Sequence, residues 1–554
     1  MPGTPVVMNP PVAAGGAQQI VHRVDDGGGD LGVGEYCRTD LSLGVRHGGN
    51  DRFLAGSTLV GRPAIRQAGR IGALGVPPTM KGRGMTEDGG GGMPEERVLP
   101  ALRAALRDEM LRPGDPEYDT ARGIWNGMID RRPSLIVRCR GVADVIAAVN
   151  FARDHRLLVA VRGGGHGVAG HAVCDGGMMI DLSGMRAVRV DPGARRAWVQ
   201  GGATWGDVDC ETTAFGLATP GGLISTTGVG GLTLSGGVGW LRGTAGLCVD
   251  NVISADVVTA DGRLLHASET ENPDLYWAIR GGGGNFGIVV GFEFRLRPIE
   301  PTLMFCAAVY PEDRGAELLA LWRDFMIAAP EQVSSLAEFS TIPDDPEYPA
   351  SARGRRVVAL AAVYDGPAGD GEAATAPLRS FGTPLLDLSA RMPYRVIQSL
   401  YDPLFPKGRD RSYFRSLYLP SLDERAIGDI VSGLDARPSE MTFSSAWYFG
   451  DVVRGVASDA TAFGDRSQPW LFSIDAIWSR CEEDAANTVW ARRLWSTMRP
   501  YSNGRLYLNF LSANDDPDVV RDGVGRENYA KLARIKAKYD PTNFFRLNQN
   551  IAPA

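Results

Sequence analysis

The residues of this chain best suited to chemistry are one histidine and the glycines around it. His166 follows three consecutive glycines in the stretch RGGGHGVAG at 162–170, and two more glycine clusters follow, TTGVGGLTLSGGVG at 226–239 and RGGGGNFG at 280–287. Consecutive glycines let backbone N–H groups converge on an anion without obstruction by Cβ atoms. One such loop would be interpreted as a tight turn. Three of them, each flanked by predicted strands, favour a long ligand that carries a diphosphate.

The obvious ligand for such loops would be a dinucleotide in a Rossmann site. Two of the clusters match the pattern GxGxxG, at Gly165, Gly167, Gly170 and at Gly282, Gly284, Gly287. A Rossmann loop leaves a strand and opens a helix, whose N-terminus receives the pyrophosphate. Here the first match leads into a turn and a strand, and the second follows a helix and enters a strand. The context therefore argues against a Rossmann site.

His166 itself is predicted to act on the ligand that the glycines hold. Its loop is expected to offer no local packing partners, so a place in the core of a strand is excluded. A neutral imidazole is a competent nucleophile. A metal site is not expected, because His166 and His171 lack the helical i,i+4 spacing and the seven scattered cysteines contain no CxxC pair.

Composition excludes several classes of partner. The 554 residues carry 58 basic and 65 acidic side chains, for a net charge of −7, which argues against nucleic acid or an anionic membrane as the main partner. No apolar run approaches the roughly 20 residues of a membrane-spanning helix. The first residues do not resemble a secretory signal. With unpaired cysteines, these features predict a cytoplasmic protein.

The elements that position the loops follow from hydrophobic periodicity. A strand at 134–139, a helix at 142–155 and a strand at 156–162 form an α/β unit. Strands dominate from 178 to 296, with a hairpin turned by Asp261 and Gly262. Beyond Pro298 and Pro301, alternating helices and strands indicate an α+β region. Residues 1–95 are rich in Gly, Pro and Arg and are expected to be a disordered tail or sequence upstream of a misassigned start.

Five stretches in order along the chain resemble one family. They are RGGGH at 162–166, GVGG and SGGVG within 228–239, NPDLYWAIRGGGGNFG at 272–287, YLNF at 507–510 and YDPTNFFRLNQNI at 539–551. Together they resemble the berberine bridge enzyme-like flavoproteins, which are FAD-linked oxidases of the vanillyl-alcohol oxidase type. The resemblance implies an α+β fold with a two-subdomain FAD-binding domain, formed by residues 97–298 and 503–554. Residues 299–502 would form an antiparallel-sheet substrate domain covered by helices.

The resemblance also implies how the cofactor is held. His166 would bind covalently to the 8α-methyl group of FAD. Many relatives form a second link through a cysteine, but Ile224 stands at that position here, so a single link is expected. The remaining implied cofactor contacts are Arg162, Gly163, Gly164, Gly165, Gly167, Thr226, Thr227, Gly228, Gly230, Gly231, Gly236, Val258 and Asn548. Gly167 departs from the family, where many relatives carry Asn.

The implied reaction is hydride transfer from a C–H bond of an alcohol, sugar or secondary metabolite to the flavin, with molecular oxygen as the expected acceptor. Two alternatives stay open: a dehydrogenase that passes electrons to a protein or quinone, and a flavin-retaining binding protein without turnover. Tyr507 is the candidate base, although its pKa near 10 would need to be lowered. It could instead be an aromatic wall under the flavin.

Asp475 is a second catalytic candidate, on a strand expected to face the substrate. The sequence favours the simpler interpretation that its side chain points to the surface. Four aromatic residues of the middle region could line a substrate cavity or belong to the core, namely Tyr413, Trp447, Tyr448 and Trp478.

Overall fold

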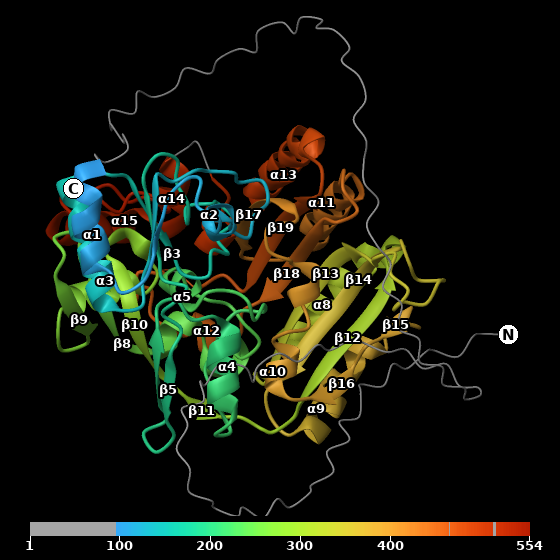
Figure 1. Cartoon of the computed structure of the whole chain (residues 1–554). Coiled ribbons are helices and arrows are strands. Elements are labelled where there is room, and N and C mark those ends of the chain that lie inside the picture. Colours follow the sequence, from blue (N-terminus) through green and yellow to red (C-terminus); the bar gives the residue numbers. More distant parts are fainter. Residues whose placement is uncertain (1–95, 465, 514–516) are drawn as a thin grey trace, which may run out of the picture.

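The computed structural model describes residues 96–464, 466–513 and 517–554. The predictions made for residues 1–95 lie outside this range. The chain folds into two bodies that each contain their own sheets and that lie side by side (Figure 1). The predicted α+β class is confirmed.

The first body begins with a small sheet in the order β1-β2-β4-β3. Strands β2 (Leu135–Arg138), β4 (Met178–Asp181) and β3 (Val159–Arg162) are parallel, and β1 (Met110–Leu111) is antiparallel to β2. Helix α3 (Val142–Asp154) connects β2 to β3 and buries Val145, Ala148, Val149 and Ala152, which share one helical face. Strand β3 lies at the edge of this sheet and ends at Arg162, and the first glycine loop therefore starts there.

A second, antiparallel sheet completes the core of the first body. Its order is β5-β6-β10-β8-β9. The strands are β5 (Val188–Asp191), β6 (Arg196–Gln200), β10 (Ile288–Arg295), β8 (Val252–Val258) and β9 (Leu264–Ser268). Strands β8 and β9 form the predicted hairpin around Asp261 and Gly262. The third glycine loop runs directly into β10, which brings it to the same end of the body as the first loop.

The C-terminal segment returns to the first body. Helices α14 (Pro517–Val524) and α15 (Arg526–Tyr539) are drawn in red in Figure 1, and Phe544 and Phe545, which follow α15, pack in one apolar cluster with Leu99 and Leu102 of α1 (Leu99–Ala105). The buried Lys536 forms an ion pair with Asp540 at 2.7 Å and donates hydrogen bonds to the carbonyls of Asn285 and Phe545. These bonds join the last residues of the chain to the third glycine loop.

The second body is built on one large antiparallel sheet. Its main order is β15-β12-β14-β13-β18-β19-β17, and β16 (Ala390–Met392) also pairs with β12. The strands are β15 (Leu386–Asp387), β12 (Leu303–Pro311), β14 (Arg356–Tyr364), β13 (Val333–Thr341), β18 (Phe443–Tyr448), β19 (Trp470–Trp478) and β17 (Arg411–Leu419). The chain passes from the first body to this sheet between β11 (Arg297–Pro298) and β12. The predicted boundary between residues 298 and 299 lies in this passage, and the division into domains stays a prediction.

A layer of helices covers one face of the large sheet. These are α8 (Gly315–Ala328), α11 (Glu424–Asp435) and α13 (Asp484–Met498). Along β19, Phe472, Ile474, Ala476 and Trp478 pack against this helical layer. Because side chains alternate along a strand, the residues between them face the first body. This second face packs in one apolar cluster with Trp240 and Leu241 of the first body and with helix α10 (Tyr394–Ile397), so its side chains lie at the boundary between the two bodies.

The middle glycine cluster differs from its prediction. Residues Val229–Leu234 form helix α5, and Gly236 and Gly237 continue the turn with positive φ values. The expectation that every cluster is flanked by strands is therefore wrong. Six residues are too few for a clear hydrophobic period, which is why the helix was not predicted.

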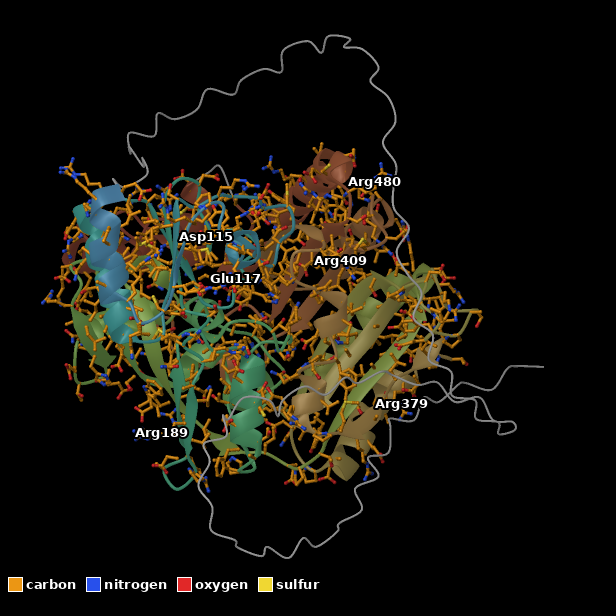
Figure 2. All side chains as sticks on the ribbon, viewed as in Figure 1. Asp115, Glu117, Arg189, Arg379, Arg409 and Arg480 are labelled. Carbon is orange, nitrogen blue, oxygen red and sulfur yellow. The ribbon has the colours of Figure 1, made fainter. Side chains whose placement is uncertain are left out.

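Charged side chains of both signs project from several parts of the surface. Glu117 precedes α2 (Tyr118–Arg122), Arg189 lies on β5 and Arg480 follows β19 (Figure 2). This distribution agrees with the small net charge. In the described ranges, no helix is both long enough and apolar enough to cross a membrane.

Candidate functional site

A cavity of about 220 Å³ lies where the glycine loops of the first body meet the C-terminal segment. Its lining includes Gly163, Gly167, His171, Gly201, Gly230, Gly231, Gly283, Gly284, Asn509, Asn548 and Gln549. All three predicted glycine clusters thus contribute to one cavity. Residues 120 positions apart in sequence meet here because β3 ends and β10 begins at this edge of the body.

Several glycines leave the cavity open to a ligand. A Cβ atom added at Gly167, Gly231 or Gly284 would meet no protein atom within 4 Å, and each of these residues lines the cavity. A ligand can therefore approach the backbone closely at three points. This is the arrangement that backbone N–H groups need to hold a diphosphate.

Two other glycines hold the first and middle loops together. A Cβ atom on Gly164 would lie 2.4 Å from the amide nitrogen of Gly228, and one on Gly228 would lie 2.3 Å from that of Gly164. The two backbones are therefore in direct contact. Gly164 and Gly228 shape the site, whereas Gly167 and Gly231 line it.

This difference gives a matched pair of variants. Gly228→Ala is expected to destabilise the protein by about 1–3 kcal/mol, because the two loop backbones must separate. Gly231→Ala is expected to change the stability of the cofactor-free protein by less than about 1 kcal/mol and to weaken FAD binding. Thermal unfolding without FAD and titration with FAD measure the two effects. Equal stability of both variants would contradict the assigned roles.

Unsatisfied polar atoms in the cavity also point to a ligand. Asn548 Oδ1 and His171 Nδ1 are buried and have no hydrogen-bond partner within the described part of the chain. Both residues line the cavity. Burial, and secondarily the charge of Arg131, lowers the pKa of His171 to about 4, so its ring is neutral. Because buried polar atoms are normally hydrogen-bonded, a polar ligand would supply the missing hydrogen bonds of both side chains.

His166 lies beside this cavity and is held on two sides. Its Nε2 atom is 3.1 Å from Thr226 Oγ1, and its ring stacks on Trp125 with centroids 5.2 Å apart and an interplanar angle of 18°. The expectation that His166 lacks packing partners is therefore wrong. Burial lowers its pKa to about 4, with a smaller contribution from Lys407. The imidazole is neutral near pH 7, and Nδ1 is the nitrogen that Thr226 does not occupy.

Tyr507 is fully buried next to the cavity. Its hydroxyl oxygen accepts hydrogen bonds from the Gly237 amide at 3.1 Å and from Asn509 Nδ2 at 2.9 Å. Burial raises the pKa of Tyr507 to about 12, which is opposite to the shift that a base requires. Tyr507 is thus a neutral phenol near pH 7 that can donate its O–H proton in a hydrogen bond. Its role as the base stays a prediction.

Asp475 lies on the face of the large sheet that is turned toward the first body. It is 5% exposed and accepts a hydrogen bond from the Ser473 hydroxyl. The interpretation of Asp475 as a surface residue is therefore wrong, because a strand in the middle of a covered sheet has no exposed face. Burial raises the pKa of Asp475 to about 8.

Aromatic rings connect Asp475 to His166. Phe414 and Phe443 lie directly opposite Asp475 on the two neighbouring strands. Phe414 is 6.0 Å from the ring of Trp125, and both Phe414 and Phe443 belong to the apolar cluster around Trp125. Since Trp125 stacks on His166, the carboxyl group and the imidazole border the same aromatic region.

Of the four predicted aromatic wall residues, one faces this region. Trp447 lies on the face of the sheet that is turned toward the first body, with its ring 6.0 Å from that of Phe510. Tyr413 and Trp478 belong to the core beneath the helices, and Tyr448 packs against that core. The alternation of side chains along β17, β18 and β19 decides this separation.

The other predicted cofactor residues divide into two groups. Gly163, Gly230 and Asn548 line the cavity. The second group supports it. Arg162 donates to Asp181 and to the Ala121 carbonyl, while Val258 is buried in the core. Gly165 accepts a hydrogen bond from the Trp125 amide, and Thr227 accepts one from the Trp205 amide. Gly236 packs against Phe463 and Tyr507.

Sequence reasoning missed several lining residues. They are His171, Gly201, Gly283, Gly284, Asn509 and Gln549. Signals for some of them were present, because Gly283 and Gly284 lie in the third glycine cluster and Asn509 lies in YLNF. No local pattern distinguishes His171 or Gly201.

Comparison with known proteins agrees with this geometry. The family described as "FAD binding domain" matches residues 133–268, and "Berberine and berberine like" matches residues 524–552. An FAD-linked oxidoreductase of Dictyostelium discoideum is 30% identical over 447 residues, which cover 80% of this chain and 94% of that protein. The (R)-6-hydroxynicotine oxidase of Paenarthrobacter nicotinovorans is 30% identical over 468 residues, which cover 82% of this chain and 98% of that protein.

A solved structure shows the same fold. BBE-like 1 of Physcomitrella patens has a TM-score of 0.73 at 22% identity and covers 82% of this chain and 99% of its own. The predicted fold of the vanillyl-alcohol oxidase type is confirmed. The first matched segment contains the first two glycine loops and His166, and the second contains Asn548. The chain therefore belongs to the berberine bridge enzyme-like family of FAD-linked oxidoreductases.

Proposed function

We propose that this oxidoreductase is an oxidase that holds FAD through one covalent bond at His166. It would oxidise a C–H bond of an alcohol, sugar or secondary metabolite and pass the electrons to molecular oxygen. The observation that carries the proposal is the neutral imidazole of His166 beside a glycine-lined cavity, with Nδ1 unoccupied by Thr226.

The residues of the chain fit FAD. The open positions at Gly167, Gly231 and Gly284 would admit its diphosphate, and the unsatisfied atoms of Asn548 and His171 would find polar partners on it. Ile224 has no thiol, so His166 is the proposed single attachment residue. Bound FAD supplies the two-electron acceptor for the reaction.

Asp475 is the proposed proton acceptor. Its carboxylate would take the proton from a substrate O–H group while the neighbouring carbon gives up hydride. A pKa of about 8 means that the carboxylate form, which is the active base, increases as the pH rises toward 8. Phe414 and Phe443, which flank Asp475, would keep bulk water away from the reacting group.

Tyr507→Phe tests whether the Tyr507 hydroxyl acts on the substrate. The Tyr507 oxygen accepts hydrogen bonds from the Gly237 amide and from Asn509 Nδ2, so its O–H proton can point to a substrate oxygen. Anaerobic flavin reduction is expected to slow by about 10- to 100-fold while the yellow colour is retained. Tyr310→Phe is the control, since it removes another buried hydroxyl, bonded to the Leu378 carbonyl. Equal reduction rates for the wild type and Tyr507→Phe would assign Tyr507 to the aromatic wall.

The attachment and the acceptor need separate measurements. Acid-denatured, protease-digested protein should retain flavin on the peptide that contains His166. Sugars, alcohols and polyketide alcohols are then screened for peroxide release. Reduction of the flavin without oxygen consumption would favour the dehydrogenase, and absence of reduction by any substrate would favour the flavin-retaining binding protein.

A further inference from the structure

Both contacts that orient the His166 ring depend on one segment of the second body. We call residues 402–408, which lie within the connection from α10 (Tyr394–Ile397) to β17, the strap. The strap passes beside Trp125 and beside the turn that carries Thr226. These are the two residues that stack on His166 and hydrogen-bond to it.

At one end of the strap, Asp402 binds the turn before Thr226. Its carboxylate accepts hydrogen bonds from the Ser225 amide at 2.8 Å and from Ser225 Oγ at 2.5 Å. It also interacts with the backbone N–H group of Thr226. These bonds join residues 177 positions apart and fix the place of the Thr226 hydroxyl relative to His166.

At its other end, the strap holds Trp125. Trp125 Nε1 donates to the Phe405 carbonyl at 2.9 Å, and the Gly408 amide donates to the Trp125 carbonyl at 2.8 Å. The indole ring is therefore fixed by two bonds to the strap. Lys407, also in the strap, lies close enough to His166 to disfavour the protonated ring.

The chemistry of attachment depends on this arrangement. A neutral imidazole has one N–H group and one nitrogen with a free lone pair, and the hydrogen bond to one nitrogen decides which is which. If Thr226 Oγ1 accepts the Nε2–H bond, the lone pair is on Nδ1. Only the nitrogen with the lone pair can form a bond to a carbon atom.

We propose that the strap prepares His166 for flavin attachment, with Asp402 positioning Thr226 so that the Thr226 hydroxyl accepts the Nε2–H bond. This inference rests on the proposed covalent link. The step forms a bond between Nδ1 and the 8α carbon of FAD. The methyl group and the imidazole each lose one hydrogen, and FAD is reduced by two electrons. Molecular oxygen then accepts both hydrogens and both electrons, giving hydrogen peroxide.

The test follows attachment rather than turnover. Full-length protein from riboflavin-limited cells is incubated with FAD, and the acid-stable flavin fraction is measured against time. Thr226→Val is expected to slow attachment about tenfold or to mix the attached nitrogens, while Thr226→Ser stays within about threefold of the wild type. NMR of the flavin peptide identifies the attached nitrogen, which is expected to be Nδ1 in the wild type.

Asp402→Ala tests the strap itself. It is expected to slow attachment about tenfold, with reversible FAD affinity within about threefold of the wild type. Asp324→Asn is the control, an exposed carboxylate on α8 that pairs with Arg323. Should Asp402→Ala fail to fold, the Thr226 pair decides the question.

The outcomes separate this inference from the proposed function. Attachment at Nδ1 in Thr226→Val at the wild-type rate, or attachment of the wild type at Nε2, would overturn the role of the strap and leave the covalent link intact. A wild-type protein that never retains flavin after acid treatment would overturn the covalent link and, with it, this inference.

Discussion

Replacement of His166 by alanine is expected to abolish the covalent flavin completely. Acid treatment of the variant should release all of its flavin, because Ile224 offers no second thiol for attachment. The variant should still bind FAD reversibly. The glycine positions that admit the ligand and the unsatisfied atoms of Asn548 and His171 remain in place.

The stability of the two proteins should then depend differently on FAD. A ligand that binds only the folded state stabilises it by about 2.7 kcal/mol at 100 times its dissociation constant. The melting temperature of His166→Ala should therefore rise with added FAD. The melting temperature of the wild type should not change, because the proposed covalent bond would retain its flavin.

His266→Ala is a suitable control for this experiment. His266 is exposed on β9 and pairs with Asp256, away from the residues that line the cavity. It should retain acid-stable flavin. Acid-stable flavin in His166→Ala would show that another residue forms the link.

Asp475→Asn is expected to lower kcat/KM by about 10²- to 10⁴-fold, the usual contribution of a general base. In the wild type, kcat/KM should rise with pH and level off above about 8, because the pKa of Asp475 is about 8. In the variant this rise should disappear. The amide has nearly the same shape as the carboxyl group, so flavin content should not change.

The same substitution, which lowers activity, should raise the free energy of unfolding at high pH. An unfolded aspartate has a pKa near 3.9, and burial raises the folded value to about 8, so between these limits the folded state binds the proton more tightly. The contribution of Asp475 to stability is therefore complete below pH 4 and lost as the pH rises through 8. Asp475→Asn should gain stability relative to the wild type over this range.

Glu338→Gln distinguishes the base from a second buried acid. Glu338 lies on the same sheet, accepts a hydrogen bond from Tyr401, and has a pKa that burial raises to about 8. Glu338→Gln, like Asp475→Asn, should therefore gain stability relative to the wild type as the pH rises toward 8. The pH dependence of kcat/KM should persist in Glu338→Gln. If it disappears there and persists in Asp475→Asn, the proposed base is wrong.

Much of the fold could be predicted because its determinants are local. Helix α3 and strands β2 and β3 follow from the spacing of apolar residues within about thirty positions. The β8–β9 hairpin follows from the Asp261-Gly262 turn, and α8, α11 and α13 follow from apolar residues at helical spacing. Short elements such as α5 were missed because a few residues do not establish a period.

The residue types of the site could also be predicted, but their partners could not. Glycine clusters show by themselves where a backbone can approach a ligand, and His166 among them marks a nucleophile. That Gly164 touches Gly228, or that Thr226 holds His166 across 60 positions, depends on how distant loops meet. A chain that folded without these contacts could have the same glycine clusters and the same histidine, so the sequence pattern does not reveal them.

The burial of the Asp475 side chain and the contacts of the strap are decided entirely by the tertiary structure. Alternation along β19 divides its residues between two faces, but only the docking of helices on one face and the first body on the other makes Asp475 buried. The sequence by itself determined which groups can react and which segments form helices and strands. Packing between distant segments decided the protonation, orientation and partners of those groups, because desolvation and hydrogen bonding depend on neighbours in space.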